Sequence, residues 1–109
     1  MLATSREIGY RYLAGVAVRL LGESLVATEP EAARRHLDAA RQMLEDVDAR
    51  NDLAKALAAR GSLHQTMGEH SAARQLLEEA LAIFEALGTV DETVRVRGML
   101  ESTQSAQDG

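Results

Sequence analysis

The chain contains an internal repeat, which favours a fold built from stacked copies of one supersecondary unit. A shift of 40 residues places the segment 33–45 on the segment 73–85. The matching pairs are Ala33 and Ala73, Arg34 and Arg74, Leu37 and Leu77, Ala40 and Ala80, and Glu45 and Glu85. The segments before them align with a shift of 39, which places Gly22 on Gly61. We therefore expect two equivalent units, with a difference of one residue in the turn between their halves.

Apolar residues recur every three or four positions in five segments, which is the spacing of one buried helix face. The many alanines and leucines and the single proline also favour helix, because alanine and leucine lose little side-chain freedom there. No segment shows a strand pattern. Polar corners and glycines predict helices at about 4–25, 28–47, 53–67, 69–87 and 89–103, and Gly68 and Gly88 should end the third and fourth of them.

Composition excludes several classes of function. The net charge of −5 argues against a nucleic-acid-binding module, which needs a basic surface for phosphate contacts. No run of about 18 apolar residues is present, so we predict no membrane-spanning helix and no membrane partner. The chain has no cysteine, which excludes disulfides and thiolate sites, and no signal-peptide pattern follows Met1. A cytoplasmic protein is the plain expectation.

The two copies share a motif of small and large residues. The first reads Val18-x-x-Leu21-Gly22-x-x-Leu25 and then Ala33-x-x-x-Leu37-x-x-Ala40, and the second reads Leu57-x-x-Arg60-Gly61-x-x-His64 and then Ala73-x-x-x-Leu77-x-x-Ala80. This pattern resembles the tetratricopeptide repeat (TPR) family over nearly the whole chain. The resemblance implies an all-α fold, in which antiparallel helical hairpins stack as a short TPR-like α-solenoid of five helices.

The resemblance also implies one domain over 1–109, with repeat 1 at about 4–50, repeat 2 at about 51–88, a capping helix at about 89–103 and a frayed tail at 104–109. The period of about 40 exceeds the usual length of about 34, which is typical of long-repeat members and similar to C-terminal TPR regions of large bacterial signalling and regulatory proteins. Gly22 and Gly61 should let paired helices approach closely, whereas Leu37 and Leu77 should fill the space between neighbouring hairpins. Arg60 departs from the motif, because it replaces the expected leucine.

In TPR arrays the first helix of each pair lines a concave groove, so the resemblance implies that a protein or peptide partner binds there. Counted from the motif glycine, the groove positions hold Val16, Arg19, Glu23, Val26, Lys55, Ala58, Ser62, Gln65 and Arg95. Their three cations would make the groove basic, so that an acidic peptide or a C-terminal carboxylate can dock. The alternative, which we favour, is that they are ordinary surface cations.

Two repeats and a cap are fewer than the roughly three units that such stacks usually need to bury a continuous core. The first helix should therefore leave an apolar face uncovered, which offers Tyr10, Tyr12, Leu13 and Val16. We expect this face to pair about a two-fold axis and give a homodimer. The alternative is a fragment, or a regulatory appendage, of a larger bacterial signalling protein whose catalytic domain lies elsewhere.

The sequence offers little for catalysis. The three histidines, His36, His64 and His70, lack the spacing of a metal site. Adjacent acids such as Glu78 and Glu79 point in different directions on a helix and suit a solvated face. No phosphate-binding loop and no Ser–His–Asp arrangement is present. We therefore predict a non-catalytic protein–protein interaction module that needs no metal and no cofactor.

Overall fold

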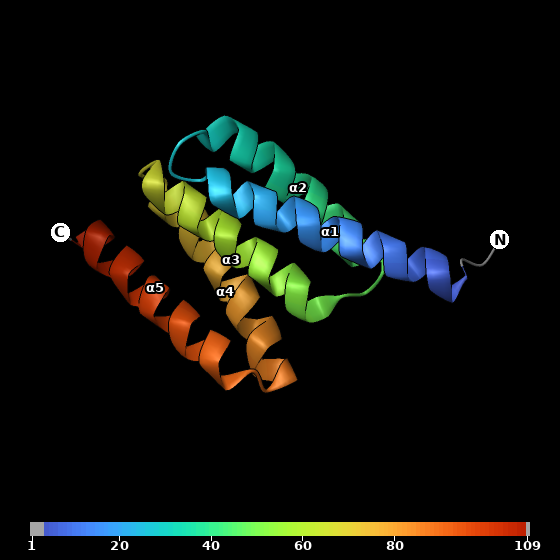
Figure 1. Ribbon diagram of the computed structural model, residues 1–109. Coiled ribbons are helices and arrows are strands. Elements are labelled where there is room, and N and C mark those ends of the chain that lie inside the picture. Colours follow the sequence, from blue (N-terminus) through green and yellow to red (C-terminus); the bar gives the residue numbers. More distant parts are fainter. Residues whose placement is uncertain (1–3, 109) are drawn as a thin grey trace.

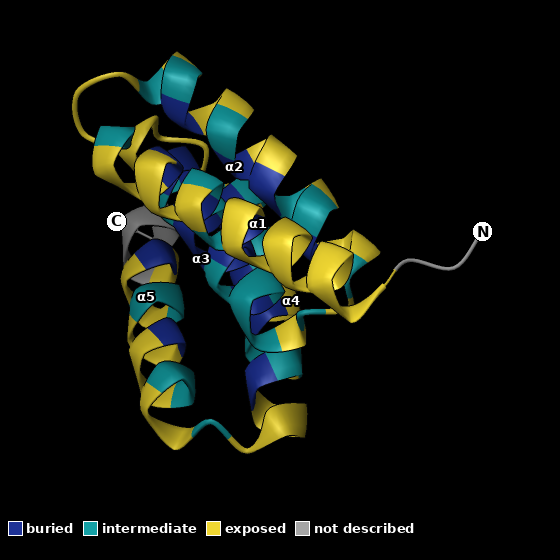
Figure 2. Ribbon diagram, turned by 45° about the vertical axis from the view of Figure 1, so that its right-hand side comes forward, coloured by how far each residue is buried: buried dark blue, intermediate teal, exposed yellow. Residues whose placement is uncertain are grey.

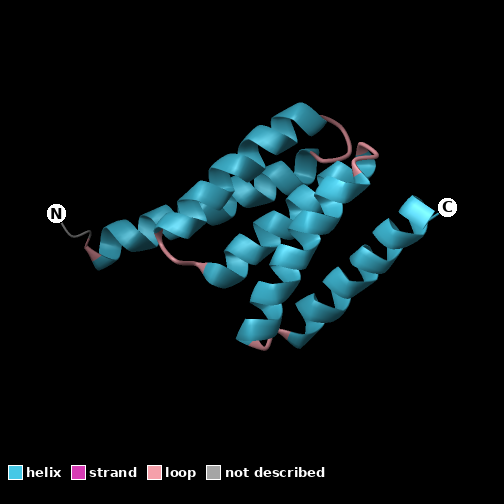
Figure 3. Cartoon of the chain, turned by 180° about the vertical axis from the view of Figure 1, so that it is seen from behind, coloured by secondary structure: helices cyan, strands magenta, loops and turns pink. Residues whose placement is uncertain are grey.

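The structure is a computed structural model that describes residues 4–108, with side chains described up to residue 104. It consists of five helices, α1 (Ser5–Leu25), α2 (Pro30–Asp46), α3 (Arg50–Thr66), α4 (His70–Leu87) and α5 (Val90–Asp108). Within the described residues there is no strand. Helices α1 and α2 form one hairpin, α3 and α4 form a second, and α5 packs against α4 (Figure 1). Short loops join neighbouring helix ends (Figure 3). The predicted all-α stack of hairpins is confirmed.

The sequence repeat reappears in the burial of the second helix of each hairpin. The residues of α2 and α4 that have no exposed surface are Ala33, Leu37, Ala40 and Leu44, and Ala73, Leu77, Ala80 and Phe84. These two sets match position by position under the shift of 40. The repeat therefore encodes one packing pattern that is used twice.

Gly22 and Gly61 are points of close approach within the two hairpins. A Cβ atom on Gly22 would lie 2.8 Å from Cγ of Leu37, and one on Gly61 would lie 2.8 Å from Cγ of Leu77. Carbon atoms pack at about 3.5–4.0 Å, so these sites accept a glycine and nothing larger without movement. The predicted tight contact at Gly61 is confirmed. Leu37 and Leu77 each cover the glycine of their own hairpin, and Leu77 also belongs to the buried cluster that α3 and α4 share with α5.

Residues in the left-handed backbone region follow three of the helices. Gly68 follows α3 with a φ of 77°, and Gly88 caps α4 with a φ of 73°. Glycine adopts this conformation without a Cβ clash, which agrees with the predicted helix ends. Asp48 occupies the position equivalent to Gly88 and has a φ of 54°. Aspartate tolerates this region better than most residues, although at a cost in free energy.

Buried apolar residues form two clusters along the stack. One joins α3, α4 and α5, and its members are Ala54, Leu57, Ala58, Leu77, Ala80, Phe84 and Val96. The other joins α2 and α3 through Ala40, Leu44 and Ala56, with Val16 and Val18 of α1 packed against it. The buried residues of α1 itself are Gly15, Arg19 and Gly22. Close approach of its backbone, more than large apolar side chains, therefore holds α1 on the stack, and much of its surface is exposed (Figure 2).

Helix α5 is longer than predicted. It continues to Asp108, whereas the sequence predicted an end at about 103. Thr103 is fully buried, and its hydroxyl donates to the carbonyl of Met99 at 3.0 Å and accepts from the side-chain amide of Gln65 in α3. The predicted capping helix therefore ends in a packed residue. Of the tail that we predicted to fray, residues 104–108 have helical backbone, and Gly109 lies outside the described residues.

Candidate partner-binding surfaces

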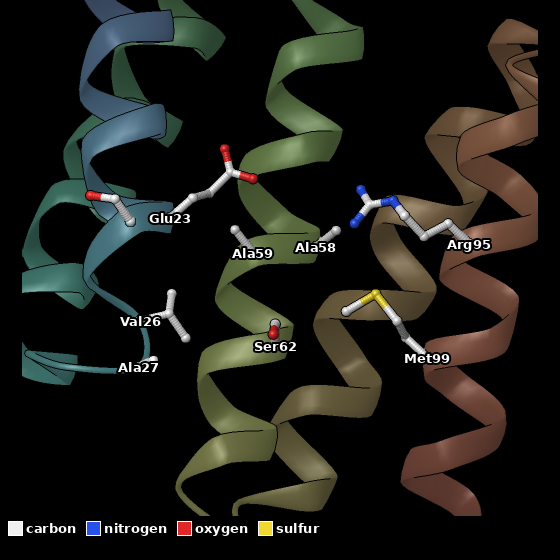
Figure 4. A pocket seen from close by; sticks show the side chains of 9 residues that line it. Glu23, Val26, Ala27, Ala58, Ala59, Ser62, Arg95 and Met99 are labelled. Carbon is white, nitrogen blue, oxygen red and sulfur yellow. The ribbon is translucent and has the colours of Figure 1, made fainter.

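A groove of about 290 Å³ lies between α1, α3 and α5 (Figure 4). The end of α1 and the turn after it form one wall, α3 forms the floor, and α5 forms the other wall. The lining residues are Glu23, Ser24, Val26, Ala27, Ala58, Ala59, Ser62, Arg95 and Met99. Side chains on the floor are small, whereas Glu23 and Arg95 extend from opposite walls towards α3 (Figure 4). A segment of another chain can therefore approach the floor closely.

Part of the predicted groove set lines this groove. The shared residues are Glu23, Val26, Ala58, Ser62 and Arg95. The structure adds Ser24, Ala27, Ala59 and Met99, which the prediction missed. Counting from the motif glycine selects about one residue per turn, whereas α3 presents two adjacent alanines to the groove. Ala27 lies in the turn after α1, directly after the predicted Val26.

The remaining predicted groove residues lie elsewhere. Val16 packs against the cluster of Ala40, Leu44 and Ala56, so it belongs neither to the groove nor to an exposed face. Lys55 is partly buried outside the groove lining. The side-chain amide of Gln65 donates to the carbonyl of Met99 at 3.1 Å and to the hydroxyl of Thr103, and therefore joins α3 to α5. The fourth residue, Arg19, is buried.

Arg19 belongs to a polar cluster between α1 and α3. Its guanidinium forms an ion pair with Glu23 and lies 3.6 Å from one carboxylate oxygen of Asp52. The hydroxyl of Tyr12 donates to the other carboxylate oxygen of Asp52 at 2.7 Å. This hydrogen bond raises the pKa of Tyr12, and the negative charge of Asp52 acts in the same direction. The cluster joins the first helices of the two hairpins where α1 has few buried apolar side chains.

These ion pairs change the expected charge of the groove. Arg19 is engaged by Glu23 and Asp52, and Arg95 forms an ion pair with Glu92 at 2.7 Å. The charged residues that line the groove are Glu23 and Arg95, one of each sign. The groove lining is therefore not basic, because Arg19 is buried and Lys55 lies outside it. Arg95 fits the alternative of an ordinary surface cation, and docking of an acidic peptide stays a prediction.

The side of α1 that faces away from α2 is apolar and exposed. Its large side chains are Tyr10, Leu13, Leu20 and Leu21, which are 65%, 62%, 55% and 46% exposed. Ala14, Ala17 and Ser24 lie between and beside them and are exposed too. We call the set Tyr10, Leu13, Ala14, Ala17, Leu20, Leu21 and Ser24 the outer face of α1.

The outer face matches part of the predicted self-association surface. Tyr10 and Leu13 belong to it, whereas the hydroxyl of Tyr12 is held by Asp52 and Val16 packs inwards. Under the shift of 39, Ala17 corresponds to Ala56, which is fully buried. Ser24 corresponds in the same way to Leu63, which is also fully buried. Leu20 corresponds to Ala59, which is buried too, whereas the other four positions of the face have half-buried equivalents. The outer face is therefore more exposed than the same positions of the second repeat.

The histidines do not gather into a site. In His64, Nδ1 lies 2.8 Å from the carboxylate of Glu69, and Nε2 lies 3.4 Å from the guanidinium of Arg60. Arg60 also forms an ion pair with Asp38 of α2, while burial lowers the pKa of its guanidinium. The arginine that departs from the motif thus joins α3 to the first hairpin. Among the residues described, no group of three or more His, Cys, Asp or Glu is placed to hold a metal ion.

Two stacked helical hairpins, each closed over a glycine and flanking an open groove, define a helical-repeat protein. The tetratricopeptide repeat family model matches residues 12–86, a range that extends from α1 to the end of α4. The chain therefore belongs to the tetratricopeptide repeat family. Searches of curated proteins and of solved structures returned no match. Members of this family are in general non-catalytic scaffolds for protein–protein interaction.

None of the described helices is long and apolar enough to cross a bilayer.

Proposed function

We propose that this chain is a non-catalytic adaptor that holds a segment of another protein in the groove between α1, α3 and α5. The observation that supports this function most directly is the floor of the groove, where Ala58, Ala59 and Ser62 leave room between two walls (Figure 4). Small side chains allow the backbone of a bound segment to approach α3. Val26 and Met99 offer apolar contact on either side, which is the usual source of binding energy in such a site.

Charge should orient the partner more than it strengthens binding. Glu23 is already paired with the buried Arg19, and Arg95 is paired with Glu92. A largely exposed pair such as Arg95–Glu92 contributes only about 0–1 kcal/mol. A partner that presents a cation to the Glu23 wall and an anion to the Arg95 wall would extend both pairs. Complementary charges of this kind select the direction in which a segment binds.

A matched pair of substitutions tests the groove. Ser62→Arg places a long cation on the groove floor, and Ala82→Arg places the same side chain on the exposed side of α4. Each variant is used to capture proteins from the native source, and the captured proteins are quantified by mass spectrometry against the unaltered chain. We expect Ser62→Arg to lower partner recovery at least tenfold and Ala82→Arg to leave it unchanged. Equal recovery by both variants, with unchanged circular dichroism, would show that the groove is not the binding site.

The second part of the proposal is self-association through the outer face of α1. Tyr10, Leu13, Leu20 and Leu21 form a contiguous apolar patch, and patches of several hundred Å² usually mark an interaction site. A homodimer at micromolar concentration would cover it. Leu13→Glu should prevent the dimer, because it would bury an unpaired carboxylate in the contact. Sedimentation of the unaltered chain and of this variant is the corresponding measurement.

The alternative function is a regulatory appendage of a larger bacterial signalling protein, located in the cytoplasm. One observation favours it: α5 also exposes apolar residues, since Val90 and Val94 are 70% and 64% exposed. Further repeats would then cover both ends of the stack. The natural open reading frame distinguishes the two functions, because the appendage requires coding sequence for more repeats or for a catalytic domain.

A further inference from the structure

We propose that two copies of this chain pair through the outer face of α1 as antiparallel helices that cross at Ala17 on a two-fold axis. The inference rests on the proposed self-association and adds its geometry, namely which residues of the two copies meet. It follows from the spacing, size, charge and area of the outer face.

The outer face has the same spacing in both directions along α1. From Tyr10 to Ser24 its successive steps are three, one, three, three, one and three residues, with Ala17 at the centre. A two-fold axis at Ala17 therefore places every residue of the face opposite a residue of the same face. Tyr10, Leu13, Ala17, Leu20 and Ser24 alternate by three and four residues, which is the spacing of helices that pack along their length.

The residues that this axis brings together are complementary in size. Ala17 meets Ala17 of the second copy, so the helix axes can approach to about 10 Å, within the usual range for packed helices. Leu20 meets the small Ala14, and Leu13 meets the apolar Leu21. Tyr10 meets Ser24 at the two ends of the contact, where the tyrosine hydroxyl stays in water. The Ser24 hydroxyl already donates to the carbonyl of Leu21 at 2.7 Å, so covering it leaves no donor unpaired.

The outer face carries no charge between Tyr10 and Ser24. The charged residues in this stretch are Arg11, Arg19 and Glu23. Arg19 is buried towards α3 and pairs with Glu23, and Arg11 stands four residues before Gly15, on the side of α2. Two copies can therefore meet without desolvating an unpaired charge, which is the main obstacle to pairing a surface with itself.

The area of the outer face suits a weak dimer. Its four large side chains are about half exposed, so together with the small residues beside them each copy offers on the order of 500 Å² at most, given roughly 150–250 Å² for an aromatic side chain and less for a leucine. The pair would bury about 1,000 Å², near the lower limit for a specific interface. The outer surface of α5 fits this face less well, because exposed Arg97 and Glu101 accompany its valines and a head-to-tail stack would not close.

Single cysteines test the crossing point, because the chain has no cysteine of its own. Ala17→Cys would place two thiols across the axis, within the Cβ separation of about 3.5–4.5 Å that a disulfide needs after small adjustment. Ser24→Cys is the matched control on the same exposed face, since its two copies would be about 21 Å apart along the helix. Both full-length variants are oxidised mildly, and their disulfide dimers are quantified by non-reducing electrophoresis. Circular dichroism checks the fold of each variant, and the unaltered chain is sedimented in parallel.

We expect Ala17→Cys to form disulfide dimer at least ten times faster than Ser24→Cys, and a mixture of Ser24→Cys with Tyr10→Cys to give the mixed dimer. If the unaltered chain is dimeric but Ala17→Cys shows no such preference, the crossing at Ala17 is wrong while self-association stands. A dominant mixed product between Ala17→Cys and Val94→Cys would instead indicate head-to-tail stacking of α1 on α5. A micromolar dimer is mostly associated at about 100 µM. An unaltered chain that stays monomeric at this concentration overturns both the self-association and the crossing at Ala17.

Discussion

Replacing Gly61 with alanine should destabilise the protein, although alanine is the better helix former. The added Cβ atom would lie 2.8 Å from both Cγ and Cδ2 of Leu77 and 3.3 Å from the carbonyl oxygen of Ala73. Leu77 has no exposed surface, and the carbonyl belongs to the backbone of α4, so neither neighbour can move away freely. The paired helices must therefore separate, or the leucine must leave its preferred rotamer.

Two opposing terms give the magnitude. Removing a helical glycine gains about 0.5–1 kcal/mol, whereas inserting a methyl group into a packed contact costs about 1–3 kcal/mol. The difference between these ranges is centred on a net loss of about 1 kcal/mol for Gly61→Ala, which lowers Tm by roughly 4–8 °C in a domain of this size. Gly61→Leu should cost several kcal/mol, at or beyond the upper end of the usual ~1–3 kcal/mol for overpacking.

Thermal and urea unfolding, followed by circular dichroism, measure the effect, and Gly98→Ala is the matched control. Gly98 is helical and exposed, and a Cβ atom there would have no neighbour within 4 Å. Gly98→Ala should therefore stabilise the protein by up to about 1 kcal/mol. Leu77→Ala should relieve part of the Gly61→Ala penalty in the double variant, because the two sites share one contact. A rise in Tm for Gly61→Ala equal to that for Gly98→Ala would refute the close packing of α3 on α4.

Three other predictions concern single residues. Asp48→Gly should raise the free energy of unfolding, measured by urea titration, by about 0.5–1 kcal/mol, because glycine adopts the left-handed φ of 54° without a Cβ clash. No change would mean that the backbone of Asp48 is unstrained. Thr103→Val should lower the free energy of unfolding by about 0.5–1.5 kcal/mol, since the Gln65 amide loses its hydroxyl acceptor but keeps the carbonyl of Met99. A neutral effect would mean that this hydrogen bond does not hold α5 on α3. In a Tyr10→Phe background, absorbance titration should show Tyr12 ionising above the ordinary pKa of about 10, and Asp52→Asn should lower that pKa. Because folding raises this pKa, the Tyr12–Asp52 hydrogen bond stabilises the folded protein fully below about pH 10, and this stabilisation is lost as the pH rises through the Tyr12 pKa of the folded state. Equal Tyr12 pKa values with and without Asp52 would contradict the hydrogen bond.

Features that occur in both repeats could be predicted from the sequence. Gly22 and Gly61 align with each other, and so do the alanines and leucines that face them, which identified the buried side of α2 and α4. The glycine ends of α3 and α4 followed from local backbone chemistry. Gly15, by contrast, also packs tightly, with a hypothetical Cβ atom 2.9 Å from Cδ2 of Leu44. It aligns with an alanine in the second repeat, so self-similarity gave no signal there.

The polar contacts that shape the candidate surfaces could not be predicted in this way. Arg19 has the helical register of a groove residue, but its burial depends on Asp52 and Tyr12, which converge on it only once α3 packs on α1. Thr103 stands in a polar stretch, and its contact across to α3 is made with the distant Gln65. Leu21 occupies a motif position that packs on the preceding repeat. Leu21 is 46% exposed, whereas its equivalent, Arg60, reaches Asp38 of the first hairpin.

The central claim is that this chain binds another protein chain through an exposed surface. Sedimentation velocity between about 1 and 100 µM tests it most directly, by measuring self-association. We predict that the 11.8 kDa chain shifts from monomer to dimer over this range, with a midpoint at micromolar concentration. Leu13→Glu should remain monomeric with unchanged helical content, and Val94→Glu, an equal change on the exposed side of α5, should still dimerise. A well-behaved monomer at about 100 µM, or a dimer that Leu13→Glu leaves intact, would contradict self-association through the outer face of α1.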